Sequence, residues 1–138
     1  MVIVGITLGA VSFNAMPNER KILQHEAQRI ALLLQLARDE AIVRNRPIAF
    51  EAEADRYRFL LHDEHIWQPL QQDDLLRERE FKRAPITFTI SPPMAEQATP
   101  LRIIFGREPV SKPFTMTMNL GDAQVAIRAD GVGHFVVE

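Results

Sequence analysis

The period of the hydrophobic pattern changes at Pro47, and this change limits the folds that the chain can adopt. Over residues 18–45, apolar side chains recur at alternating steps of four and three, a spacing that places them on one face of a helix. The positions on this face are Leu23, Ala27, Ile30, Leu34, Ala37 and Ala41. After Pro47 the period becomes two, as in half-buried β-strands. The pattern predicts an α+β fold, in which one long N-terminal α-helix packs on an antiparallel layer of one or two small sheets.

The predicted helix covers residues 18–46. Asn18 can cap its first turn, or the preceding proline can kink a helix that already runs through the residues before it. We favour the kinked, continuous helix. At the other end, Pro47 disfavours helical geometry at Arg46, so the helix is expected to stop near Asn45.

Three arginines, Arg38, Arg44 and Arg46, lie near the end of this helix and are candidates for an anion site. Cationic side chains at a helix C-terminus also complement the partial negative charge of the helix dipole. We interpret these arginines through the dipole rather than as an anion site.

The pattern of the remaining residues predicts short strands separated by turns. The predicted strands are 48–53, 56–62, 86–90, 101–105, 114–120, 124–129 and 133–137. Gly121 with Asp122 and Asp130 with Gly131 supply turn residues that place the last strands in an antiparallel meander. Two longer loops are expected, a charged and glutamine-rich one at 62–82 and one at 91–100 that holds three prolines.

The first sixteen residues carry no charged side chain. Crossing a bilayer takes roughly 20 apolar residues, so this segment is too short to cross alone. It also lacks the charged start and small-residue cleavage site of a secretory signal peptide. We expect residues 1–16 to be the remnant of a longer hydrophobic anchor helix and residues 17–138 to form a single domain.

Composition excludes several classes of protein. The net charge of −2 argues against a general nucleic-acid binder, which usually carries an excess of Lys and Arg. The chain has no cysteine, which excludes disulfides, thiolate metal sites and a cysteine nucleophile. Apolar and charged residues, at 46% and 25%, match the averages of folded domains.

Two groups of side chains have the residue types of metal ligands. They are His62, Asp63, Glu64 and His65, and Asp73, Asp74, Glu78 and Glu80. Zinc histidines usually lie on a rigid helix, so we interpret the first group as a solvated polar turn. Arg77 and Arg79 interrupt the second group and oppose a cation, so we interpret it as a charged surface loop. No metal site is predicted.

No arrangement of residues typical of catalysis is found in the sequence. Ser12, Ser91 and Ser111 lack the context of a nucleophile elbow, and no glycine-rich loop precedes a helix. Trp67, the single tryptophan, is interpreted as a core anchor rather than a ligand platform. We expect no enzyme activity and no cofactor.

The helix end reads A-R-D-E-A-I-V-R-N-R-P over residues 37–47. It resembles the helix end of the minor pseudopilin H family of type II secretion systems (general secretion pathway protein H, type IV pilin-like). The residues that carry the match are Ala37, Arg38, Glu40, Ala41, Arg44, Asn45, Arg46 and Pro47. Upstream, V-I-V-G-I-T-L-G-A-V resembles the later part of a pilin helix, and downstream I-I-F-G-R-E-P-V and V-A-I-R-A-D-G-V-G-H-F resemble the closing strands.

The resemblance implies a pilin-like fold and an N-terminal truncation, because the basic leader, the glycine cleavage point and the Phe-Thr-Leu start of these proteins are missing before Val2. As written, the sequence cannot be cut by prepilin peptidase and cannot carry the methylated N-terminal phenylalanine of these proteins. The full-length protein would be anchored in the bacterial inner membrane by a single transmembrane helix, with its domain in the periplasm.

The resemblance also implies a structural role in the pseudopilus that helps export folded proteins through the outer membrane. Helices pack in the filament core through apolar faces, which predicts an assembly surface. Its residues are Val2, Ile3, Val4, Ile6, Leu8, Val11 and Phe13. The implied partners are the other minor pseudopilins, the major pseudopilin, exported proteins and the outer-membrane secretin, with the 62–82 loop as one contact.

A related alternative is a minor type IV pilin that binds DNA. Such a protein needs clustered Lys and Arg to neutralise phosphates. The last eleven residues hold only Arg128 against Asp130 and Glu138, although Arg102 and Arg107 leave a small basic area. We therefore expect no nucleic-acid partner.

Overall fold

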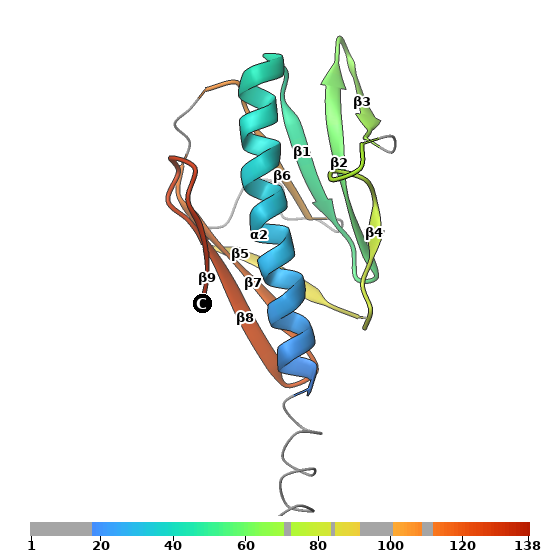
Figure 1. Cartoon of the computed structure of the whole chain (residues 1–138), viewed down its shortest axis with the longest axis vertical. Helices are drawn as coiled ribbons and strands as arrows, with labels where there is room; N and C mark the ends of the chain where they lie inside the picture. The colour runs from blue at the N-terminus through green and yellow to red at the C-terminus, as the bar shows by residue number, and fades with distance from the viewer. Residues whose placement is uncertain (1–17, 71–72, 84, 92–100, 109–111) are drawn as a thin grey trace, which may run out of the picture.

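The computed structural model describes residues 18–70, 73–83, 85–91, 101–108 and 112–138. One long helix, α2 (Asn18–Arg44), lies across two antiparallel sheets (Figure 1). This arrangement confirms the predicted α+β class, and it resolves the choice between one sheet and two in favour of two.

The first sheet has the strand order β3-β2-β1-β6. Its strands are β1 (Ile48–Ala52), β2 (Arg56–Asp63), β3 (Ile66–Pro69) and β6 (Leu101–Phe105), with β4 (Arg79–Glu80) paired to the start of β2. Phe50 on β1 lies opposite Phe59 on β2 and Ile103 on β6, and all three side chains are buried. The sheet therefore presents an apolar face to the helix.

The second sheet has the strand order β5-β7-β8-β9. Its strands are β5 (Thr87–Ser91), β7 (Phe114–Leu120), β8 (Ala123–Ala129) and β9 (Phe135–Val137). Burial alternates strictly along β7, so Phe114, Met116, Met118 and Leu120 enter the core. Gly121, at φ 58°, occupies the left-handed conformation that the tight turn from β7 to β8 requires. The predicted meander of the last three strands is confirmed.

The apolar stripe of α2 forms the centre of the core. All six positions predicted for this face are fully buried. Ala31 and Leu33 are buried as well, so the covered face is wider than the predicted stripe. The helix packs against strands of both sheets, and two flanking sheets cover more of its circumference than one sheet could.

The 62–82 segment differs from the predicted charged surface loop. It contains β3 and β4, and between them Leu76 is fully buried and Phe81 is 8% exposed. Asp73 Oδ1 accepts hydrogen bonds from the backbone N–H groups of Leu75 and Leu76, both at 2.9 Å. This local turn carries Leu76 into the core. The interpretation failed because Leu76 and Phe81, set among charged residues, leave no periodic apolar pattern.

Two residues of the first sheet also lie where the sequence did not place them. Trp67 is absent from the core and lies on the sheet face that points away from α2, so its interpretation as a core anchor was wrong. Leu60, which alternates with the core-facing residues Phe59 and Leu61 and so points to the same outer face, is nevertheless only 2% exposed. Both differences arise because this outer face has a covered apolar patch of its own.

Several predictions fall on residues outside the described ranges. They are the kink at Pro17, the assembly surface at Val2, Ile3, Val4, Ile6, Leu8, Val11 and Phe13, and the proline-containing segment 92–100. Among the residues that the structure describes, no helix combines the length and the apolar character that crossing a membrane requires.

Candidate functional site

The helix-end segment 37–47 divides into a buried half and an exposed half. Ala37 and Ala41 are fully buried, and their small side chains let the helix approach the sheets closely. On the exposed side, Arg44 Nε donates to Glu40 Oε2 at 2.8 Å, and Arg44 Nη2 lies 3.8 Å from Asp73 Oδ2. The segment thus joins the helix to the chain that precedes β4.

Arg38 lies against the turn before β9. Its Nη1 is 3.2 Å from Asp39 Oδ1, and it would come within 2.6 Å of a Cβ atom added at Gly133. Gly133 also has φ 105°, a conformation that side chains with a Cβ rarely adopt. Glycine at this position therefore lets the helix end contact the last turn.

The helix ends in a Schellman motif. Asn45 has φ 56°, its N–H donates to the carbonyl of Ile42 at 3.2 Å, and the N–H of Arg46 donates to the carbonyl of Ala41 at 3.1 Å. These two bonds satisfy carbonyls that the end of a helix leaves without partners. The helix therefore ends at Arg44, two residues before the predicted limit of 46, and Asn45 and Arg46 form its cap.

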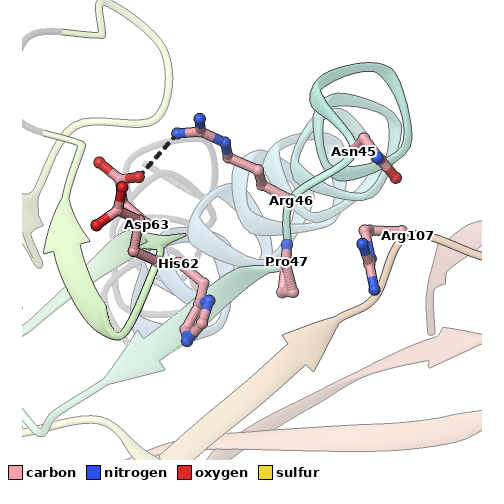
Figure 2. Close-up of a pocket in the computed structure, with 7 residues that line it drawn as sticks. Asn45, Arg46, Pro47, His62, Asp63 and Arg107 are labelled. Atoms are coloured by element: carbon pink, nitrogen blue, oxygen red, sulfur yellow. Dashed lines mark hydrogen bonds and ion pairs between the residues drawn. The ribbon is translucent and has the colours of Figure 1, made fainter.

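A hollow of about 360 Å³ lies beside this cap (Figure 2). It is lined by Asn45, Arg46, Pro47, His62, Asp63, Glu64 and Arg107. Arg46 reaches over to Asp63, with 3.1 Å between Nη1 and Oδ1, while Arg107 lies on the other side of Pro47. Small-molecule sites are mostly apolar and enclosed, whereas this lining is charged and largely exposed. The hollow suits a contact with another protein better than a ligand.

The residues considered as zinc ligands form the end of β2 and the turn into β3. Glu64 has φ 57° in this turn, and the ring of His62 lies 4.8 Å from that of Trp67. Within the described parts of the chain, no group of three or more His, Cys, Asp or Glu side chains is placed to hold a metal ion.

A buried carboxylate that the sequence analysis missed lies on β1. Glu51 is 3% exposed and accepts hydrogen bonds from Arg58 and Arg102. Burial raises the pKa of Glu51, but the hydrogen bonds from Arg102 and Arg58 outweigh it, so the pKa lies below its ordinary value. Its signal in the sequence was a charged residue within the apolar strand I-A-F-E-A.

A second buried acid, Glu26, is 2% exposed on α2 and lies 3.9 Å from Arg29. Burial raises the pKa of Tyr57 to about 12, and the charge of Glu26 adds to this, while Arg79 and Arg29 oppose it. Tyr57 therefore stays a neutral phenol at physiological pH and is unsuited to acid–base chemistry.

A model of the family described as type II transport protein GspH matches residues 26–133. The chain belongs to the GspH family. The resemblance of the 37–47 segment to that family is thereby confirmed.

A curated relative agrees with this family. Type II secretion system protein H of Pseudomonas aeruginosa is 34% identical over 76 residues, which are 53% of this chain. The chain spans 44% of the length of that relative.

Solved structures show that the fold is pilin-like. The minor pseudopilin EpsH of Vibrio cholerae matches with a TM-score of 0.64 at 18% identity, over 84% of this chain and 94% of that one. GspH of E. coli matches with a TM-score of 0.63 at 15% identity, over 87% and 91%. The type IV minor pilin FimU of Pseudomonas aeruginosa has a TM-score of 0.57 at 18% identity, over 91% and 92%. At these identities the comparison establishes the fold alone.

Proposed function

We propose that this GspH-family protein is a minor pseudopilin, a structural subunit of the periplasmic pseudopilus that helps a type II secretion system export folded proteins across the outer membrane. The family match over residues 26–133 carries the proposal. In this proposal an N-terminal apolar segment anchors the full-length protein in the inner membrane, and its domain lies in the periplasm. Its partners are the other pseudopilins, with exported proteins and the secretin as further contacts.

The described surface is consistent with an assembly role rather than with catalysis. The charged residues at the helix end are used in ion pairs that join α2 to neighbouring segments, such as Arg46 with Asp63 and Arg44 with Asp73. Of the two buried acids, Glu51 accepts hydrogen bonds from Arg58 and Arg102, and Glu26 lies 3.9 Å from Arg29. The domain thus acts as a rigid body that the helix carries, and its work is mechanical rather than enzymatic.

DNA binding, the role of a related minor pilin, is the weaker candidate. Binding to duplex DNA needs a cluster of several cations in excess over the nearby carboxylates. Arg58 and Arg102 share the carboxylate of Glu51, which leaves a net charge of only +1 there, and Arg128 lies 2.7 Å from Glu138. Among the described residues, the cations without a carboxylate at ion-pair distance are spread over the start of α2, residues 77–82 and residues 107–112 rather than gathered in one long stretch: Arg20, Lys21, Arg77, Arg79, Lys82, Arg107 and Lys112. A filter-binding titration at low salt is expected to give weak, unselective retention of duplex DNA, and tight, salt-sensitive retention would reverse this preference.

The assembly role is tested by placing a charge in the predicted assembly surface of the full-length protein. Val4→Glu is expected to abolish co-purification with the other pseudopilins and to lower secretion, because a carboxylate cannot be buried between apolar helix faces without a partner. Val4→Leu is the matched control and should behave like the wild type. Normal association and secretion of the Val4→Glu protein would contradict the proposed function.

A further inference from the structure

The face of the first sheet that points away from α2 has a covered apolar floor. Side chains alternate along β1, so Ala49 and Glu51 face away from the helix while Phe50 enters the core. Ala49 is fully buried and Leu60, its neighbour on β2, is 2% exposed, yet neither belongs to the core beneath the helix. Side chains on the outer face must therefore cover them.

The cover is built on Glu51. Its Oε1 accepts from Arg58, with distances of 2.9 Å to Nε and 2.8 Å to Nη2, and its Oε2 accepts from Arg102, with 3.2 Å to Nε and 2.6 Å to Nη2. One buried carboxylate thus orients two guanidinium groups. The three side chains together carry a net charge of +1.

Trp67 completes the cover from the opposite edge of the sheet. Its strand β3 is separated from β6 by three strand spacings, about 14 Å, yet Arg102 Cζ lies 5.8 Å from the centroid of the Trp67 ring. The two side chains must lean toward each other across β2 and β1, above Leu60 and Ala49. Guanidinium and indole contribute a cation–π contact there.

Donors and apolar surface remain available on this face. Arg58 and Arg102 use Nε and Nη2 for Glu51, and the described residues offer no acceptor to Nη1 of either arginine. The arginine side chains are 36% and 34% exposed. Beside them on β6, Ile104 is 53% exposed. The guanidinium groups of Arg58 and Arg102 therefore lie next to the exposed side chain of Ile104.

We propose that this outer face binds an acidic segment of a neighbouring pseudopilin, which places a carboxylate on the free Nη1 groups and an apolar side chain against Ile104. Guanidinium groups match carboxylates in geometry, and the excess positive charge favours an acidic partner. Because Glu51 already orders both arginines, little side-chain entropy is lost on binding. Trp and Arg are also the residue types that most often dominate protein interfaces. The inference rests on the proposed function, since it takes the segment from a pseudopilin.

The test compares two charges at one exposed position in the full-length protein. Ile104→Glu and Ile104→Lys remove the same apolar side chain, but only the glutamate repels a carboxylate and competes for Arg102. Co-purification with the other pseudopilins is expected to fall at least about tenfold for Ile104→Glu, because the added carboxylate repels the acidic partner, and to stay within about twofold for Ile104→Lys. Val136→Glu, at a residue equally 53% exposed on β9, is the control and should bind normally.

Other results would overturn the inference. Normal recovery of both Ile104 variants would show that this face does not dock, and equal loss of both would show an apolar contact without a carboxylate. Either result leaves the proposed function intact as long as Val4→Glu abolishes association. Because the chain lacks cysteine, Ile104→Cys can also carry a single photo-reactive label. Its adduct should map to a pseudopilin peptide that contains Asp or Glu, and an adduct with a second copy of this chain would contradict the inference.

Discussion

Asp130 organises the turn before β9 through one exposed side chain. Its Oδ1 accepts from the backbone N–H groups of Val132 at 2.8 Å and His134 at 3.0 Å, and its Oδ2 lies 2.7 Å from His134 Nδ1. The hydrogen bond from Val132 is the largest cause that lowers the pKa of Asp130, which falls from 3.8 to about 2. The ionised carboxylate therefore stabilises the turn that Gly131 and Gly133 allow.

A pH dependence follows from this shift. Since the pKa of Asp130 is lower in the folded chain, its contribution to stability is complete above the unfolded value of 3.8 and is lost as the pH falls toward about 2. Asp130→Asn should lower the melting temperature at neutral pH, and its difference from the wild type should shrink as the pH falls from 3.8 and disappear below the folded pKa of about 2. Thermal unfolding followed by circular dichroism checks this. A difference that is independent of pH would show that the charge plays no part.

At the scale of the elements, Pro47 and the backbone conformation of Asn45 together determine where α2 ends. Pro47 predicted where the helix could not continue, and the structure confirms a stop just before it. The left-handed conformation of Asn45 fixes the last helical residue at Arg44. Asn is one of the few residues with a Cβ that tolerate this conformation, and the sequence pattern did not indicate which position would adopt it.

The side chain of Asn45 is exposed. Substitutions at this position can therefore separate the effect of its positive φ from the effect of its side chain. Asn45→Ala is expected to lower the free energy of unfolding by about 1 kcal/mol, because alanine is strained at positive φ. Asn45→Gly should equal or exceed the wild type, since glycine adopts this conformation without strain. Urea unfolding of the three proteins measures both effects. Equal stability of the alanine and glycine variants would show that the cap does not limit stability.

At the scale of the whole molecule, residues 73–81 close the space between α2 and the first sheet. Leu76 is fully buried, Phe81 lies with its ring 5.3 Å from that of Tyr57, and Asp73 lies 3.8 Å from Arg44 at the helix end. The segment lies far from α2 in sequence, so its contacts cannot be inferred from local pattern. It belongs to the hydrophobic core despite its many charges.

Truncating Leu76 tests this role. Leu76→Ala should lower the free energy of unfolding by about 2–4 kcal/mol, because it opens a cavity in the core. Leu75→Ala, at a neighbouring residue that is 54% exposed, should change it by less than about 0.5 kcal/mol. Chemical denaturation of the two variants compares them. Similar small effects in both would contradict a core position for residue 76.

The sequence alone determined the long helix, its buried stripe, seven of the nine strands found among the described residues, and the family, because each of these rests on periodicity or on a contiguous motif. Tertiary structure decided the remainder. The small strands β3 and β4 exist through pairing with β2, Leu76 is buried through contacts far along the chain, and Glu51 meets Arg102 only because β6 pairs with β1. The outer face of the first sheet is the clearest case. Its residues come from four strands, and only sheet pairing brings them together.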